Sequence, residues 1–213
     1  MKKLILPLLL LLGITMLMAV ESAPSAIVGY VKYDCVAGLN YIALPMNAGY
    51  GMASDLANAY PGVMDVINYW DNTTQSWVAA NDLGFMWDGD FPVAPGNALM
   101  VNAVSATPLY SIGAMPATNA SYSMVAGLNS IMLPLNKGTI TLASELGVDV
   151  GNLDVINYWD NTTQSWVAAN DLGFMWDGDF PITIGMPLMA NALSSAVWPT
   201  GARTNSARLS TSK

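Results

Sequence analysis

The sequence predicts a mainly β protein made of two tandem small β-sandwich or barrel-like units, each with one short helix. Residues 65–92 and 154–181 are identical at every position, and the offset between them is 89. The same offset aligns the tripeptide Gly-Leu-Asn at 38–40 with the one at 127–129. Short β-branched and aromatic segments recur about every ten residues with turn signals between them, which is typical of small sandwiches and barrels.

The first 19 residues have the pattern of a secretory signal peptide. Lys2 and Lys3 form a positive start, an uncharged apolar run follows, and Ala19 is a small residue suited to cleavage. We therefore expect a secreted protein that is extracellular or on the outer cell surface. An uncleaved membrane anchor remains an alternative, because the apolar run is close to the length that spans a bilayer. Residues 20–28 are expected to be a linker.

The first repeat unit, residues 29–117, begins with predicted strands at 29–37 and 40–46. A short helix is expected at 52–60, with Ser54 as its cap and Pro61-Gly62 at its end. Predicted strands at 66–70 and 76–80 form a hairpin in which Trp70 lies opposite Trp77. Residues 81–92 are read as a long ordered loop or a wide hairpin connection, and further strands follow at 98–105 and 108–112.

The second unit, residues 118–206, is expected to repeat this course, and residues 207–213 form a polar tail. Its predicted strands are at 122–126, 129–135, 155–159, 165–169 and 187–193, with a short helix before the third. Two like units in tandem bury apolar surface that each would expose alone.

The composition argues against several classes of function. The formal net charge is −8, and without Lys2 and Lys3 five basic residues face 15 acidic ones, which gives −10. We expect no nucleic-acid partner, because phosphate binding needs clustered Lys and Arg, and no membrane contact beyond the signal segment. Only 10% of residues are charged, and such a weakly self-repelling surface suits self-association or contact with neutral glycans. A plain secreted composition without assembly is the alternative.

Residue types needed for catalysis are scarce, so we expect a protein that is not an enzyme. Histidine is absent, which removes the commonest general base, most zinc sites and histidine-dependent triads. A glycosidase with two aspartates as acid and base is the remaining enzyme reading.

Cys35 is the single cysteine and aligns with Met124 in the second copy. We interpret it as an apolar core position rather than a reactive thiol.

The chain resembles a group of secreted bacterial repeat domains. Their pattern begins with GLN and an I-x-LP strand, continues with a short helix and a WD-x-x-TQ-x-W hairpin, and ends with a late PG-x-x-x-x-V strand. It is present here at 38–45, 70–77 and 95–101, and again at 127–134 and 159–166, whereas Ile184-Gly185-Met186 departs from the late turn. The resemblance implies a β-rich domain and an extracellular or envelope location, and it implies no chemistry, because the group has no assigned activity.

The irregular segment of each copy holds the candidate ligand-binding residues. Aromatic faces beside carboxylates are what a sugar ring needs, and binding residues concentrate in loops. The alternative is that these tryptophans pack against a core. The candidates for ligand binding are Trp87, Asp88, Asp90, Trp176, Asp177 and Asp179.

The same segments are candidates for a structural calcium ion, because calcium takes oxygen ligands. The spacing does not match the twelve-residue calcium loop, so solvated or turn-capping aspartates are the alternative. No other cofactor is expected. The candidate metal ligands are Asp82, Asp88, Asp90, Asp171, Asp177 and Asp179.

These observations together favour a secreted, non-enzymatic cell-surface or extracellular matrix or filament protein that acts by self-assembly or adhesion. The alternative is a tandem carbohydrate-binding protein that uses the loop tryptophans and aspartates. The identical stretches favour a surface repeated twice, suited to multivalent binding or head-to-tail assembly, although a recent duplication also explains them.

Overall fold

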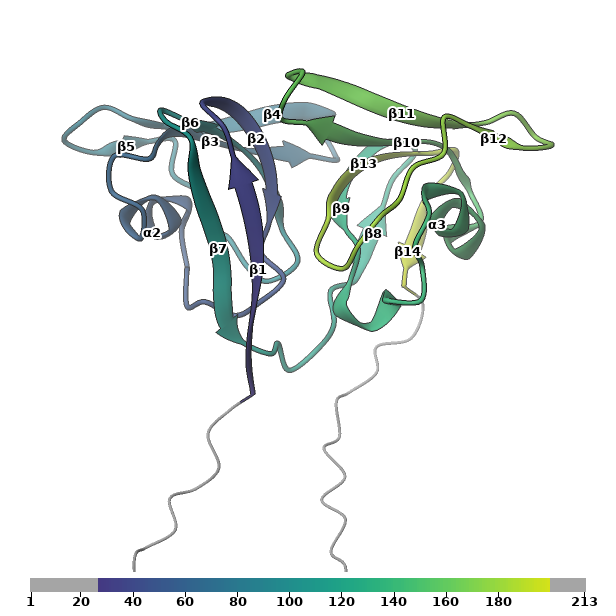
Figure 1. Ribbon diagram of the computed structural model, residues 1–213, viewed down its shortest axis with the longest axis horizontal. Coiled ribbons are helices and arrows are strands. Elements are labelled where there is room, and N and C mark those ends of the chain that lie inside the picture. The colour runs from purple at the N-terminus through teal and green to yellow at the C-terminus, as the bar shows by residue number, and fades with distance from the viewer. Residues whose placement is uncertain (1–26, 200–213) are drawn as a thin grey trace, which may run out of the picture.

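The computed structural model describes residues 27–199, and the predicted signal peptide and tail lie outside this range. The chain is mainly β and forms two units of the same design (Figure 1). The first unit consists of β1 (Val28–Cys35), β2 (Gly38–Ala43), α2 (Ala53–Asn58), β3 (Met64–Asp71), β4 (Ser76–Asp82), β5 (Trp87–Asp88), β6 (Ala98–Ala103) and β7 (Thr107–Ala114). The second consists of β8 (Tyr122–Met124), β9 (Gly127–Met132), η1 (Leu135–Lys137), α3 (Ala143–Val150), β10 (Leu153–Asp160), β11 (Ser165–Asp171), β12 (Trp176–Asp177), β13 (Pro187–Ala192) and β14 (Ala196–Trp198).

Each unit pairs a five-stranded antiparallel sheet with a two-stranded ribbon. The strand order is β2-β6-β3-β4-β5 in the first unit and β9-β13-β10-β11-β12 in the second. The ribbons are β1–β7 and β8–β14. Because the two orders correspond strand for strand, the repeat seen in the sequence is also a repeat of the fold.

Each unit has its own hydrophobic core between sheet, ribbon and helix. Ile67, Leu99 and Leu56 are among the buried residues of the first core, and Ile156, Leu188 and Leu146 take the corresponding places in the second. A third, smaller cluster joins the units and contains Tyr41, Ala43, Ala98, Met100 and Met132. The units are therefore packed against one another rather than strung as separate beads.

The helices begin without the expected serine cap. The residue before α2 is Met52, and the Asp55 carboxylate accepts hydrogen bonds from the backbone N–H groups of Gly51 and Met52, each at 2.9 Å. Ser54 lies inside the helix, so its predicted capping role is wrong. An acidic side chain in the first turn satisfies the free N–H groups just before the helix and also complements the helix dipole.

The hairpins of the identical stretches fold as predicted. Trp70 pairs with Trp77 and Trp159 with Trp166, with ring centroids 5.3 Å and 5.2 Å apart in edge-to-face geometry. The segment read as a loop or wide hairpin is a tight hairpin, because β5 pairs with β4 and β12 pairs with β11.

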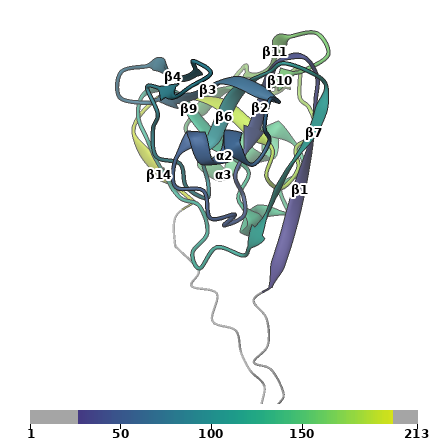
Figure 2. The same ribbon diagram turned by 90° about the vertical axis from the view of Figure 1, so that its left-hand side faces the viewer.

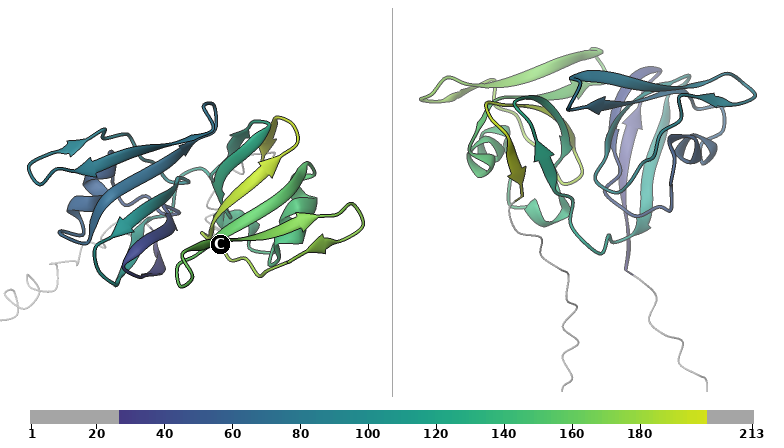
Figure 3. Two further views of the ribbon diagram at one scale, coloured as in Figure 1. Left: turned by 90° about the horizontal axis from the view of Figure 1, so that it is seen from above. Right: turned by 180° about the vertical axis from the view of Figure 1, so that it is seen from behind.

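The two units lie side by side with their long hairpins running in opposite directions, as seen from above in Figure 3. The β4–β5 and β11–β12 turns lie at opposite ends of the long axis in Figure 1. Helices α2 and α3 both lie beneath these hairpins (Figures 1 and 2). The described chain thus presents one broad face on which the same turn occurs once at each end.

Candidate functional site

The irregular segments that hold the candidate ligand-binding and metal-binding residues fold as identical tight hairpins. Leu83 N–H donates to the Met86 carbonyl at 2.9 Å, and Leu172 N–H donates to the Met175 carbonyl at 2.9 Å. Gly84 adopts φ +81° with nothing within 4 Å of the place where a Cβ would stand. The left-handed conformation closes the four-residue turn at a position that suits glycine.

Large apolar side chains stand at the tips of both hairpins. Phe85 is 83% exposed and Phe174 is 82% exposed. Leu83 and Met86, like Leu172 and Met175, are about half exposed. We call each set, 83–86 and 172–175, an apolar tip. Exposed apolar residues that gather in one patch, unlike single ones, are a sign of a contact surface.

The loop tryptophans lie closer to the core than a ligand-stacking role would suggest. Trp87 and Trp176 are half-buried and pack against the cores of their units. Gly147 of α3 lies directly beneath the Trp176 ring, because a Cβ there would be 2.1 Å from the ring. Packing against the core of its unit is thus one role that each tryptophan already has.

The aspartates of these segments have mostly structural partners. Asp82 accepts a hydrogen bond from Gly84 N–H at 2.7 Å, and Asp171 accepts one from Gly173 at 2.8 Å. Asp90 accepts hydrogen bonds from the Ser54 N–H and hydroxyl at 3.1 and 2.6 Å. Asp179 binds Ser144 of α3 in the same way, at 2.9 and 2.6 Å. These carboxylates fasten the hairpin to the helix and close its turn.

Asp88 and Asp177 are exposed on the short strands β5 and β12. Within residues 27–199, no three His, Cys, Asp or Glu side chains come together as a group able to hold a metal ion. The candidate calcium ligands are thus spread along each hairpin rather than gathered around one point.

A hollow of about 530 Å³ lies beside the first hairpin. Trp87, Asp82 and Asp90 line it, together with Phe85 and Asn58. Two of the three residues expected to bind a ligand in this unit, Trp87 and Asp90, therefore share one concave surface with the candidate metal ligand Asp82, and Asp88 does not line it.

A second arrangement, at the contact between the units, was missed by the sequence reasoning. The Gln75 side chain forms two hydrogen bonds with the Leu128 backbone, at 2.8 and 2.9 Å, and the Trp70 indole N–H donates to the same carbonyl at 2.9 Å. Gln164 and Trp159 make the same three bonds to Leu39, at 2.8, 2.9 and 2.9 Å.

The contact is reciprocal, as in a two-fold symmetric dimer. Tyr33 donates to the Gly185 carbonyl and Tyr122 donates to the Gly96 carbonyl, each at 2.9 Å. Burial raises the pKa of both tyrosines well above the usual range, so the hydroxyls keep their protons. The same surface of each unit therefore binds the other unit, and the TQ and GLN motifs form hydrogen bonds across this contact.

The signal for this contact was present in the sequence. The TQ and GLN motifs occur once in each copy at the same offset, so a surface that binds its counterpart appears twice. Asn40 and Asn129 are fully buried, and each binds the backbone of the turn that precedes its strand, which holds the Gly-Leu segment in place.

No family model matches this chain, and neither the curated proteins nor the solved structures contain a match. Among residues 27–199, no helix is long and apolar enough to cross a membrane.

Proposed function

We propose that this is a secreted, non-enzymatic cell-surface or extracellular matrix protein that acts by self-association through its two apolar tips. The observation that carries the proposal is the pair of identical tips, centred on Phe85 and Phe174, at opposite ends of one body. A protein with one self-associating apolar tip forms dimers, whereas a protein with two such tips forms chains.

The packing of the units supports this geometry. The reciprocal hydrogen bonds fix one unit against the other, so the two tips keep a constant separation and direction. The low content of charged residues, 10%, leaves little repulsion to oppose contact between copies. The N-terminal segment supports secretion, and the resemblance to secreted bacterial repeat domains agrees with it.

The test is sedimentation velocity of the chain from Val20 to Lys213 over a wide concentration range. Wild type is expected to form species that grow with concentration. Phe85→Asp and Phe174→Asp each leave one tip and are expected to stop at dimers. A wild type that stays monomeric throughout contradicts the proposal, and so do single-tip variants that still form long chains.

A second candidate function is glycan binding in the hollow beside Trp87. The observation that favours it is that Trp87, Asp82 and Asp90 share this hollow. Trp87→Phe keeps an aromatic ring against the core and is expected to weaken any binding to a panel of neutral oligosaccharides. Unchanged affinity in this variant, or no binding by wild type, removes the hollow as a site.

A further inference from the structure

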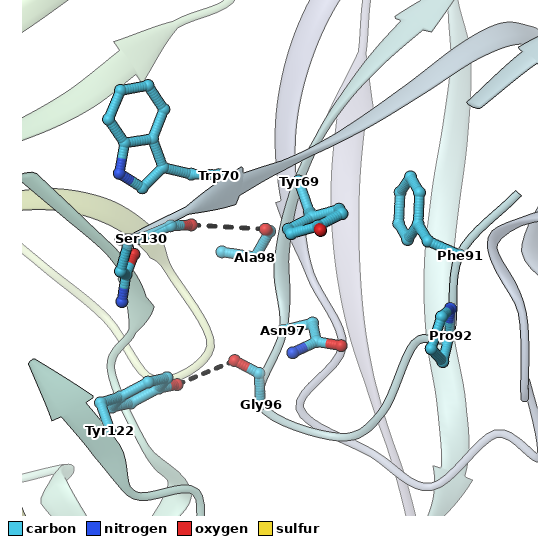
Figure 4. A pocket seen from close by; sticks show the side chains of 10 residues that line it. Tyr69, Trp70, Phe91, Pro92, Gly96, Asn97, Ala98, Tyr122 and Ser130 are labelled. Carbon is cyan, nitrogen blue, oxygen red and sulfur yellow. Dashed lines mark hydrogen bonds between the residues drawn. The ribbon is translucent and has the colours of Figure 1, made fainter. Parts of the chain in front are cut away.

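A second cavity, of about 400 Å³, lies at the contact between the two units. Its aromatic walls come from both units: Tyr69, Trp70 and Phe91 from the first and Tyr122 from the second. Figure 4 shows Tyr69 beside Phe91, Trp70 on the same strand, and Tyr122 across the cavity from them. Its volume falls in the range of small-molecule sites, about 300 to 1,000 Å³.

The cavity also contains polar groups without protein partners. The Tyr69 hydroxyl and the Nδ2 atoms of Asn72 and Asn97 have no hydrogen-bond partner among residues 27–199. The Oδ1 of Asn97 accepts a hydrogen bond from Ala94 N–H at 2.7 Å, which fixes the amide. In Figure 4 this amide lies between the aromatic walls. Oriented donors between aromatic faces are the features that recognise a hydroxylated ring.

No Asp, Glu, Lys or Arg lines the cavity. A charged ligand would lose its hydration there without a partner of opposite charge, which is costly. The lining therefore selects a neutral ligand with apolar faces and hydrogen-bonding edges.

The two-fold symmetry of the units is broken at this cavity. Three of its lining residues, Asn97, Ala98 and Ser130, correspond to Met186, Pro187 and Tyr41 at the symmetric position. Tyr41 is 4% exposed, and its hydroxyl lies 2.5 Å from the Ser130 hydroxyl. Larger side chains thus stand at the symmetric position, so we expect one such site within residues 27–199.

We propose that this cavity binds one neutral sugar ring per chain, with the ring between Tyr69 and Tyr122, which lie on opposite sides of the cavity, and its hydroxyls bonded to Asn72 and Asn97. The site shares no residue with the apolar tips or with the hollow beside Trp87. It stands or falls independently of self-association and of the hollow.

The test is a titration with glucose, galactose, N-acetylglucosamine and their disaccharides, with indole as an aromatic comparator. Binding is followed by the NMR signals of the indole N–H groups. We expect at least one sugar to shift the Trp70 signal, while the equivalent Trp159 is unaffected, with one ligand bound per chain. If no sugar shifts Trp70, if Trp70 and Trp159 shift alike, or if only indole binds, the proposal is overturned.

Variants taken from the protein's own symmetry sharpen the test. Asn97→Met places the residue of the second unit in the cavity and is expected to weaken sugar binding at least tenfold. Tyr69→Phe keeps the ring and removes one hydroxyl, so a loss of about three- to tenfold is expected. Met186→Asn is the matched control and leaves the affinity unchanged. If the folded Tyr69→Phe variant and the folded Asn97→Met variant both bind sugar as tightly as wild type, the site is contradicted.

Discussion

Gln75 and Leu128, 53 positions apart in the sequence, pair as two strand residues would. Leu128 N–H donates to Gln75 Oε1 at 2.8 Å, and Gln75 Nε2 donates to the Leu128 carbonyl at 2.9 Å. Gln75 adopts φ +52°, and Gln164, which pairs with Leu39, adopts φ +53°. A non-glycine residue in this region is strained. Each glutamine is the last residue of the turn of its hairpin, so a strained turn position carries the side chain that contacts the other unit.

Two substitutions of Gln75 distinguish the stability that its hydrogen bonds contribute from the stability that its backbone strain costs. Gln75→Ala loses both hydrogen bonds to Leu128 and the hydrogen bond to the Asn72 carbonyl, and it keeps the strain, so we expect a loss of about 1–2 kcal/mol in the free energy of unfolding. Gln75→Gly loses the same bonds but relieves the strain, and should be less destabilised by about 1 kcal/mol. Urea unfolding measures both. Equal stability of wild type and Gln75→Ala would show that the pair contributes nothing.

Gly127 tests the closeness of the two units. It has φ +108°, and a Cβ there would stand 2.6 Å from Gln75 Oε1. Gly127→Ala should therefore cost about 2–3 kcal/mol from backbone strain and the displaced glutamine together.

Gly84→Ala is the matched control for Gly127→Ala, because Gly84 has φ +81° but open space around it. It should cost about 1 kcal/mol from the backbone alone. Thermal unfolding of the two variants gives the comparison, and equal losses would contradict a contact at Gly127.

The second unit carries an ionic contact whose effect depends on pH. Asp149 binds Lys137 Nζ and the Trp198 indole N–H, each at 2.7 Å. Burial raises the pKa of Asp149, but the hydrogen bonds from Lys137 and Trp198 outweigh it and hold the pKa below its ordinary value. The stabilisation is thus present above the unfolded pKa of about 3.9 and is lost as pH falls through the folded pKa.

Asp149→Asn should lower the free energy of unfolding at neutral pH by about 1–2 kcal/mol. The difference from wild type should shrink as pH falls below about 4. Urea titrations at a series of pH values measure this, and a difference that stays constant across the acid range would refute the role of the charge.

Cys35 should be unreactive in the folded protein. It is 5% exposed, and burial raises the pKa of its thiol to about 11. The thiolate that reacts with disulfide reagents is therefore rarer by about two to three orders of magnitude near neutral pH than for a thiol of ordinary pKa. A thiol assay in native buffer and in denaturant measures the contrast. Rapid labelling of the native protein would contradict the core position.

The parts of the fold that depend on neighbouring residues in the sequence were predictable. The β-rich class, the two units and the Trp70–Trp77 pair followed from β-branched and aromatic runs and from the repeat. The helix start was not, because the side chain that satisfies it is Asp55, one residue beyond the predicted Ser54 cap. Ser54 instead binds Asp90, 36 positions away.

The functional features depended on contacts between distant segments. The sequence pointed to Trp87 and the aspartates, and the structure shows that Asp90 and Asp82 also have internal partners. The cavity between the units is lined by Ser130, whereas the larger Tyr41 stands at the equivalent position of the first unit and does not line it. A linear repeat cannot distinguish head-to-tail packing from the reciprocal packing found here, because both place identical motifs at a constant offset.

The most direct measurement of the proposed function compares two double variants by sedimentation velocity. Phe85→Asp with Phe174→Asp removes both tips. Val104→Asp with Leu193→Asp removes an equivalent pair of exposed apolar residues, 58% and 66% exposed, and adds the same charge elsewhere in each unit. We expect the tip variant to be monomeric at concentrations where wild type and the control form chains. Equal association of the two variants, or dispersal of both, would contradict self-association through the tips.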